Sequence, residues 1–309
     1  MSYSPPTPTP LAKPAWLKIK ANVTPTFQQL KSLAKQQQLA TVCQEAHCPN
    51  QAECWSSGTA AFMLMGDTCT RGCRFCNVAS GNPQGWLNPH EPQQLADAVA
   101  TMGWQYVVLT SVDRDDVPDG GAAHLAQCIQ TLKAQHPQVQ VELLSPDFCG
   151  NRDALTTVLN SGLDVFAHNV ETTEALTPHV RDRRAGYQQS LAVLRFAKQV
   201  NSALLTKTSL MLGLGESDAD ILQTLKDIKA TGCDIVTLGQ YLQPSAKHLA
   251  VQAYVSPEQF EAWKQLAEQE LGFAYCFAGP LVRSSYKAAE AAAQTLLNQQ
   301  QLPTVQQKA

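Results

Sequence analysis

The chain has 309 residues, of which 44% are hydrophobic and 16% charged, and its formal net charge is -3. This length suits one large α/β domain or two smaller ones, and the weakly acidic balance gives no reason to expect nucleic-acid binding. No run of about eighteen apolar residues occurs, and the start from Met1 to Pro10 lacks the features of a secretory signal, so we expect a cytoplasmic protein without a membrane span.

The first part of the chain is predicted to be an extension rather than a folded core. Residues 1–12 are Pro-rich without apolar periodicity and predict a flexible tail. We expect Lys13 to Lys18 to form a docking strap held by Trp16. The apolar spacing between Thr26 and Gln38 then predicts a helix that opens at a threonine cap.

Three cysteines follow in a polar segment that is typical of a loop. Cys43, Cys48 and Cys54 have the spacing C-x4-C-x5-C. Cysteines in a loop need a chemical reason, and a metal centre supplies one. A separate zinc site that uses His47 is the main alternative.

A second group, Cys69, Cys73 and Cys76, has the spacing C-x3-C-x2-C. A short loop with this spacing can fold three thiolates onto one face of an iron–sulfur cluster. Such clusters are normally held by four cysteines, so three ligands leave one iron open to another molecule. A zinc site with a fourth Cys or His, or three unrelated core cysteines, would explain the same residues differently.

The other four cysteines lie in apolar surroundings, and we interpret them as small buried hydrophobic residues. They are Cys128, Cys149, Cys233 and Cys276.

From residue 61 onward, short apolar runs alternate with helical patterns. Repeated strand–helix alternation indicates a parallel sheet with right-handed crossovers. The predicted strands are Ala61 to Met65, Tyr106 to Thr110, Val139 to Leu144, Val165 to His168, Thr208 to Leu212 and Ile235 to Leu238. The predicted helices are Pro92 to Met102, Ala122 to Gln135, Arg152 to Asn160, Tyr187 to Gln199, Asp218 to Ala230 and Pro257 to Gln269.

Six such units are too few for a complete eight-stranded barrel, and an open doubly wound sheet has the same periodicity. The polar residues that follow the strands favour a barrel-like arrangement, in which chemistry collects where strands end. These residues are Ser111, Asp113, Asn169, Glu171, Glu216, Gln240 and Gln243.

The second cysteine group, with an aromatic residue before its last cysteine, resembles the signature of the radical S-adenosylmethionine (SAM) enzymes. Both cysteine groups together resemble the lipoyl synthase family, and the likeness extends from Lys13 to Ala288. It includes the segments Thr110 to Asp116, His168 to Glu171, Met211 to Glu216 and Leu238 to Ser245. The resemblance implies a partial (β/α)6 barrel at 61–272, an N-terminal extension at 13–60 and a C-terminal extension at 273–309.

The resemblance also implies two 4Fe-4S clusters. Cys69, Cys73 and Cys76 would hold the first, whose open iron chelates SAM. The first cysteine group would hold an auxiliary cluster whose fourth ligand is Ser285, with Ser284 as the alternative. For SAM we expect contacts from Asn169 and Glu171 to the ribose, together with Ser111, Asp113 and Glu216. Arg181, Arg183 and Arg184 form a basic cluster that would meet a carboxylate or simply face solvent.

The implied activity is that of a sulfurtransferase that inserts two sulfur atoms, at C6 and C8, into an octanoyl chain bound to a lysine of a carrier protein. The implied partners are octanoylated lipoyl domains of 2-oxoacid dehydrogenases or the glycine-cleavage H protein, and flavodoxin or ferredoxin as reductant. A radical SAM enzyme with another sulfur-transfer task, such as methylthiolation, is one alternative. A non-enzymatic electron-transfer or zinc-binding protein is another.

Overall fold

The computed structural model describes residues 11–18, 24–37, 39–56, 60–290 and 292. Most of the predicted tail at 1–12 therefore lies outside the described residues. Among those described, no helix is both long and apolar enough to cross a bilayer.

One eight-stranded sheet forms the centre of the molecule. Its order is β1-β2-β5-β6-β7-β8-β9-β10, and every neighbouring pair is parallel except β1 with β2. The strands are β1 (Ala40–Thr41), β2 (Ala61–Leu64), β5 (Tyr106–Ser111), β6 (Gln140–Leu144), β7 (Val165–Ala167), β8 (Leu205–Leu212), β9 (Ile235–Gln240) and β10 (Tyr275–Gly279). A separate pair joins β3 (Thr68–Cys69) to β4 (Ala79–Ser80).

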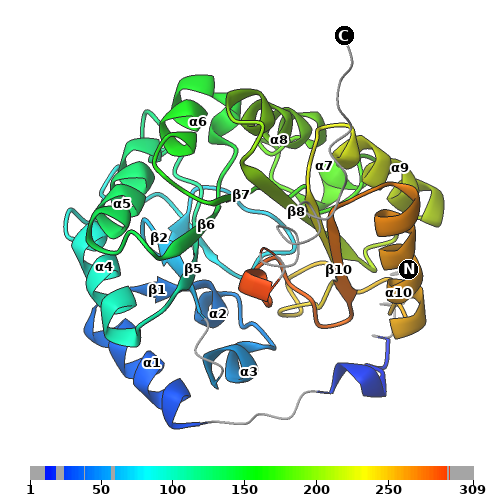
Figure 1. Cartoon of the computed structure of the whole chain (residues 1–309). Coiled ribbons are helices and arrows are strands. Elements are labelled where there is room, and N and C mark those ends of the chain that lie inside the picture. The colour runs from blue at the N-terminus through cyan, green and yellow to red at the C-terminus, as the bar shows by residue number, and fades with distance from the viewer. Residues whose placement is uncertain (1–10, 19–23, 38, 57–59, 291, 293–309) are drawn as a thin grey trace, which may run out of the picture.

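Helices surround the sheet, and Figure 1 shows them as an arc outside the curved strands. The long helices lie between successive strands, as parallel connections require. The helices are α1 (Pro25–Gln36), α2 (Val42–Glu45), α3 (Gln51–Ser56), α4 (Glu91–Met102), α5 (Ala122–Gln135), α6 (Arg152–Leu159), α7 (Thr177–Val180), α8 (Tyr187–Val200), α9 (Asp218–Lys229) and α10 (Pro257–Gln265), with three short turns η1 (Ala15–Leu17), η2 (Phe148–Gly150) and η3 (Leu266–Glu270).

The prediction of an α/β fold with a mostly parallel sheet is confirmed, and all six predicted strands are present. The prediction missed two strands at the sheet edges. β1 is only two residues long and has no pattern of its own. β10 is a short apolar run, YCFAG, and such a run cannot be told from a buried helix segment by periodicity. β10 pairs with β9 and lies within the range 273–309.

Two smaller predictions are wrong because exposure was misjudged from residue type. Leu17, not Trp16, is the buried anchor of the strap, since Leu17 is 0% exposed and Trp16 is 44% exposed. Cys149 is exposed rather than buried, whereas Cys128, Cys233 and Cys276 are buried as expected. An amphipathic ring such as that of Trp16 is stable with part of its surface in water.

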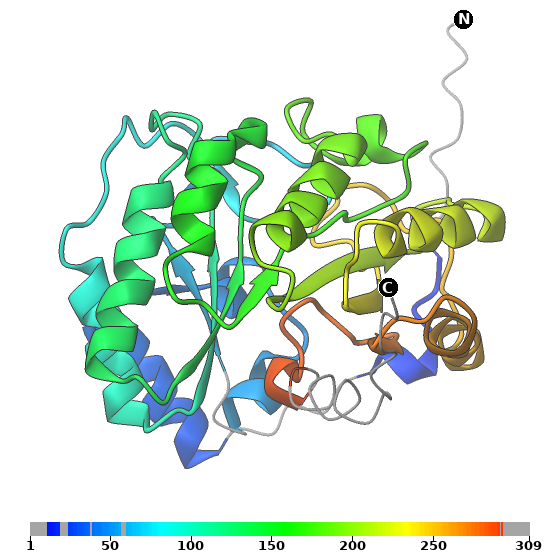
Figure 2. The same ribbon diagram turned by 45° about the horizontal axis from the view of Figure 1, so that its top comes forward.

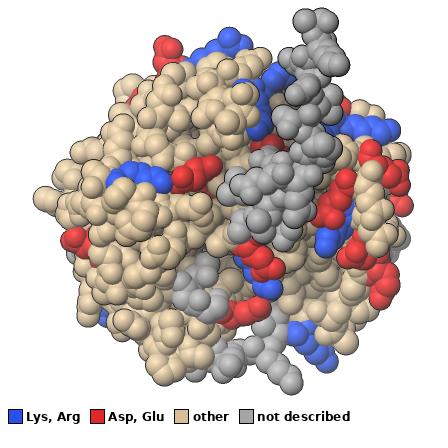
Figure 3. Space-filling model, in the orientation of Figure 1, with Lys and Arg blue, Asp and Glu red and all other residues tan. Residues whose placement is uncertain are grey.

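The segment after β10 lies beside α2 and α3, although these helices belong to the other end of the chain. Figures 1 and 2 both show the two regions adjacent, below the sheet in the second view. On the face in Figure 3, acidic and basic side chains are interspersed rather than gathered into a basic stripe.

Candidate functional site

A cavity of about 530 Å³ lies at the carboxyl ends of the parallel strands. Ser111 ends β5, Asn169 follows β7 and Gln240 ends β9, and all three line it. Parallel α/β sheets commonly place their sites at this edge. The cavity therefore lies where the sequence pattern predicted polar residues to converge.

Both cysteine groups reach this cavity. Its lining includes Cys69, Cys73 and Cys76 from one group and Cys43 and Cys48 from the other, together with Ser284 and Ser285. Cys54 is not in the lining but belongs to the same group, because burial and the neighbouring Cys43 and Cys48 thiols raise its pKa to about 12. The structure thus brings two groups that are separate in the sequence to one cavity.

Two sulfurs of the loop that carries Cys69, Cys73 and Cys76 accept backbone N–H groups, one from the loop itself and one from the segment after α7. The N–H of Asp182 donates to Cys73 Sγ at 3.2 Å, and that of Arg71 donates to Cys69 Sγ at 3.4 Å. Burial raises the pKa of Cys73 to about 12 and that of Cys76 to about 11. Such thiols need a cation to become thiolates, and N–H donors to sulfur are a recurrent means of tuning iron–sulfur centres.

Arg71 fastens this loop to the sheet. Its guanidinium is bidentate to Asp115, at 2.9 and 3.0 Å, and bidentate to Asp147, at 2.7 and 2.9 Å. Burial opposes the charged form of Asp147, but hydrogen bonds from Arg71 outweigh it and lower the pKa of Asp147 to about 2. Arg71 is only 3% exposed, so the loop cannot shift without exposing or unpairing a buried charge.

A second set of contacts covers the same loop from the segment after α7. Asp182 accepts the Gly72 N–H at 2.9 Å, and Arg184 donates to the Thr70 carbonyl at 2.7 Å. Arg184 also pairs with Asp115 at 3.1 Å. Arg184 therefore helps to hold the loop that carries Cys69, Cys73 and Cys76. The sequence predicted only that Arg181, Arg183 and Arg184 would meet a carboxylate or face solvent.

The segment with Cys43, Cys48 and Cys54 is built from two short helices, α2 and α3. It lies directly against the other cysteine loop, because Asn77 Nδ2 donates to the Glu45 carbonyl at 2.9 Å. The same amide lies 3.4 Å from His47 Nδ1. The ring of His47 thus faces the second cysteine loop.

The serine segment comes to this group from the far end of the chain. Asn50 Nδ2 donates to the Leu281 carbonyl at 2.6 Å, and Tyr286 Oη donates to Glu53 at 2.8 Å. Tyr286 also stacks on Phe277 of β10, with ring centroids 5.6 Å apart. These contacts hold the serine segment against the segment that carries Cys43, Cys48 and Cys54, although more than 200 residues separate the two, and Ser285 lines the same cavity as Cys43 and Cys48.

Asn169 and Glu171 are two residues apart, and Asn169 Nδ2 donates to Glu171 Oε1 at 3.1 Å. Glu171 has φ +71°, a strained conformation for a side-chain-bearing residue that is most often kept at functional sites. Burial raises the pKa of Glu171, and the guanidinium of Arg181 opposes the shift. Both residues line the cavity.

Arg181 is a site residue to which the sequence assigned no specific role. It is 7% exposed, lines the cavity and donates Nη1 to the Val170 carbonyl and to Ser190 Oγ. Its Nε has no hydrogen-bond partner among the described residues. A buried, partly unpaired guanidinium in a cavity suits a carboxylate of a bound molecule.

Ser111 and Asp113 also line the cavity and present polar groups to it. Ser111 Oγ is buried without a hydrogen-bond partner among the described residues. Burial raises the pKa of Asp113 to about 6, although Arg71 lies 3.4 Å away and opposes the shift. An unpartnered buried hydroxyl in a cavity indicates a ligand that supplies the missing hydrogen bond.

The side chains of Glu216 and Gln240 bind backbone groups of nearby turns. Glu216 accepts the backbone N–H groups of Gly213 and Leu214 and does not line the cavity. Gln240 lines the cavity, but its amide bonds four backbone groups, including the Ala253 carbonyl and the Val255 N–H. Both shape the glycine loop after β8 and the turn after β9.

His168 is linked to Arg181 through the hydroxyl of Ser190. Its Nδ1 lies 2.9 Å from the Ser145 carbonyl and its Nε2 lies 2.9 Å from Ser190 Oγ, which already accepts a hydrogen bond from Arg181. This pattern fits a neutral ring that donates from Nδ1 and accepts at Nε2. Burial lowers the pKa of His168 to about 4.

Neither cysteine group is as compact as the ligand set of a tetrahedral zinc ion. Zn–S bonds of about 2.3 Å in a tetrahedron place the sulfurs about 3.8 Å apart. Among the described residues, Glu91, His124 and Cys128 bring three ligand atoms within 4.8 Å of one another, and neither cysteine triad does. A cluster is larger than an ion and spreads its ligands farther apart.

Both the sequence and the fold of this chain are similar to those of known proteins. Residues 63–228 match the model of the radical SAM superfamily. The chain is 55% identical to the mitochondrial lipoyl synthase of Eremothecium gossypii, over 92% of this chain and 78% of that protein, and 55% identical to the lipoyl synthase of Halorhodospira halophila, over 89% and 82%. Among solved structures, it is similar to the FeFe-hydrogenase maturase of Carboxydothermus hydrogenoformans (TM-score 0.57, 11% identity, 87% of this chain and 69% of that chain) and to methylornithine synthase (0.54, 14%, 80% and 73%).

Proposed function

The chain belongs to the lipoyl synthase family of the radical SAM superfamily, and we propose that its cavity assembles both iron–sulfur centres of such an enzyme around one octanoyl chain. The activity is that of a sulfurtransferase. The observation that carries the proposal is the cavity itself, since residues of both cysteine groups line it together with Ser285, although Cys54 does not.

We assign Cys69, Cys73 and Cys76 to the SAM-binding 4Fe-4S cluster. For SAM, the assigned residues are Ser111, Asp113, Asn169 and Glu171, to which we add Arg181 for a carboxylate. Glu216 was predicted as a direct contact, and we propose that it acts indirectly by holding the Gly213–Leu214 backbone. The bound cluster and SAM supply one-electron chemistry that generates a carbon radical able to abstract hydrogen from an alkyl C–H bond.

We assign Cys43, Cys48, Cys54 and Ser285 to an auxiliary 4Fe-4S cluster, which is the sulfur donor and therefore a substrate. Oxygen is a poorer partner than thiolate for iron in a sulfide cluster. A serine ligand thus favours release of one iron as sulfur is withdrawn. Tyr286 and Asn50 keep Ser285 in place until then.

The protein's own task is placement. C6 and C8 of an octanoyl chain are unactivated carbons that no acid or base of near-neutral pKa can deprotonate. The residues of this chain must therefore align the alkyl carbon with both centres and exclude water. An apolar cavity wall, which includes Ala61, Met63 and Val108, suits the hydrocarbon.

We further propose that the curved sheet is a partial (β/α)6-type barrel extended by β10, with the flanking parts at 13–60 and 273–309 supplying the auxiliary site. The carrier proteins we expect are octanoylated lipoyl domains of 2-oxoacid dehydrogenases or the glycine-cleavage H protein, with flavodoxin or ferredoxin as reductant. A cytoplasmic location stays a prediction, since the relatives include proteins named as mitochondrial.

Single-turnover chemistry tests the proposal. The chain is reconstituted anaerobically, iron and sulfide are counted, and an octanoyl-lysine peptide is incubated with SAM and dithionite. About eight irons per chain and a product that gains two sulfurs are expected for two 4Fe-4S clusters. SAM cleavage without sulfur insertion would retain the radical SAM assignment and contradict the lipoyl synthase one.

A further inference from the structure

The turn between β2 and the loop from Asp67 to Cys76 has two consecutive residues with positive φ. Met65 has φ +66° and Gly66 has φ +91°. For Met65, which carries a side chain, this conformation is costly and persists only where the surroundings impose it. Only three residues lie between Met65 and Cys69 in the sequence: Gly66, Asp67 and Thr68. The conformation of Met65 therefore fixes where the cysteine loop begins.

Both peptide groups of Met65 are held by charged side chains. Its N–H donates to the two carboxylate oxygens of Glu91, at 3.0 and 3.2 Å. Its carbonyl accepts a hydrogen bond from Arg114 Nη1 at 3.1 Å, and Arg114 is itself bound by Asp116 at 2.7 and 2.8 Å. Buried peptide groups that leave a sheet need such partners.

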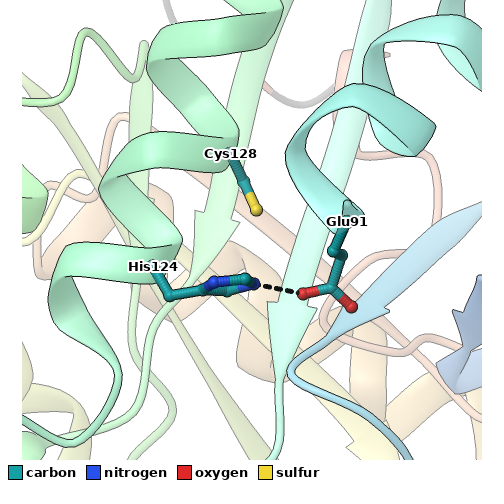
Figure 4. Close-up of side chains that lie close together, drawn as sticks. All are labelled: Glu91, His124 and Cys128. Atoms are coloured by element: carbon teal, nitrogen blue, oxygen red, sulfur yellow. Dashed lines mark hydrogen bonds and ion pairs between the residues drawn. The ribbon is translucent and has the colours of Figure 1, made fainter. Parts of the chain in front are cut away.

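His124 orients the Glu91 carboxylate. Figure 4 shows its ring, on α5, directed at Glu91, in the first turn of α4, and the Nε2–Oε2 distance is 2.6 Å. The two side chains are buried, at 8% and 7% exposure. Gly121 begins the same helix with φ +84°, and a Cβ there would overlap Met65 Sδ. The start of α5 therefore packs on Met65 through Gly121, and the same helix acts on the Met65 peptide indirectly, through His124 and Glu91.

Cys128 lies one turn beyond His124, and its sulfur completes a set of three ligand atoms within 4.8 Å. A metal ion here would have to take the Glu91 oxygens that already accept the Met65 N–H. It would also have to deprotonate a thiol whose pKa is raised by burial and by Glu91. The observed contacts are those of a hydrogen-bonded pair, with Cys128 as a packing neighbour.

We propose that Glu91 and His124 are positioning residues for the radical reaction: they fix the Met65 peptide and so set where the loop from Asp67 to Cys76 places its thiolates over the cavity. Neither residue lines the cavity. Their action resembles that of residues behind metal ligands, which orient the ligands without touching the metal. The inference rests on the proposed function, because it presumes a SAM-binding cluster on those cysteines.

The test uses the full, anaerobically reconstituted chain and the variants His124→Ala, His124→Gln and Cys128→Ala. Two properties are measured on each: the rate of SAM cleavage, and the change that SAM produces in the electron paramagnetic resonance spectrum of the reduced protein. Circular dichroism confirms folding, and metal analysis of the protein before reconstitution detects any ion at the three residues.

For His124→Ala we expect cleavage slowed on the order of tenfold, as for other residues that orient metal ligands, and an altered SAM-dependent spectrum. His124→Gln restores both properties because its amide can donate to Glu91, and Cys128→Ala matches the wild type. A folded His124→Ala chain with wild-type cleavage and spectrum would overturn the inference. So would a metal ion that is lost equally in His124→Ala and Cys128→Ala. Failure of the wild-type chain itself to cleave SAM would instead contradict the proposed function.

Discussion

Tyr286 donates its hydroxyl to the carboxylate of Glu53 at 2.8 Å and thereby joins the serine segment to the helix that carries Cys54. The two residues are 233 positions apart in the sequence. Because Ser285 precedes Tyr286 directly, this contact places the proposed serine ligand. The proposed auxiliary site thus depends on a tertiary contact between residues that are far apart in the sequence.

Tyr286→Phe should make the auxiliary cluster lose iron more readily, since it removes one hydrogen bond worth about 1 kcal/mol while keeping the stack on Phe277. The measurement is iron per chain over time under a chelator, in a chain whose Cys69, Cys73 and Cys76 are replaced by Ala. Ser285→Ala should have a larger effect and Ser284→Ala a smaller one. Equal effects of the two serine variants would contradict the assignment of Ser285.

The two cysteine groups should be separable by mutation. Replacement of Cys43, Cys48 and Cys54 by Ala should leave about four irons per chain and retain SAM cleavage, while sulfur insertion is lost. Replacement of Cys69, Cys73 and Cys76 should abolish cleavage itself. Quantified 5′-deoxyadenosine and peptide mass distinguish these outcomes, and loss of cleavage in both variants would show that the sites are not independent.

Arg71→Lys should destabilise the chain by about 3 to 5 kcal/mol, because a lysine cannot be bidentate to both Asp115 and Asp147 and leaves a buried carboxylate poorly paired. Arg184→Ala is the matched control, because the Arg184 side chain is 38% exposed and its pairs should contribute about 1 kcal/mol or less. Denaturant unfolding of the metal-free chains gives both values. Similar losses in the two variants would refute the role given to Arg71.

His168 should make the fold less stable at acid pH. Burial lowers the pKa of His168 to about 4, below the value of about 6.5 in an unfolded chain, so the unfolded state takes up a proton that the folded state does not. The contribution of His168 to the free energy of unfolding is therefore unchanged above pH about 6.5, and it falls by up to about 3 kcal/mol as the pH drops toward 4. Unfolding free energies at several pH values check this, and His168→Gln should flatten the dependence. An unchanged slope in that variant would exclude His168 as its source.

SAM affinity should depend on Arg181 and Glu171. Arg181→Lys keeps the charge but loses the planar donor set, and Glu171→Gln keeps the shape but loses the charge, so each should weaken SAM binding about tenfold or more. Equilibrium binding to the reconstituted chain measures the effect. Gln243→Ala, at another cavity-lining residue, should change affinity little.

Local sequence alone predicted the α/β class and six strands of the sheet, and it identified both cysteine groups as candidate metal ligands. Ligand spacing within a loop and apolar periodicity within a strand are short-range properties, and they can be read from neighbouring residues. The edge strands β1 and β10 were not predicted, because β1 has only two residues and a short apolar run such as β10 can belong to a strand or to a buried helix.

Only the tertiary structure decided which distant residues meet. It brought Ser285 to the same cavity as Cys43 and Cys48, gave Arg71 its partners Asp115 and Asp147, and directed Glu216 to a backbone turn rather than to the cavity. It also paired His124 with Glu91 behind the cluster loop. The physical reason is that packing of helices on the sheet fixes these encounters, and the charge or polarity of a residue does not reveal which distant group will satisfy it.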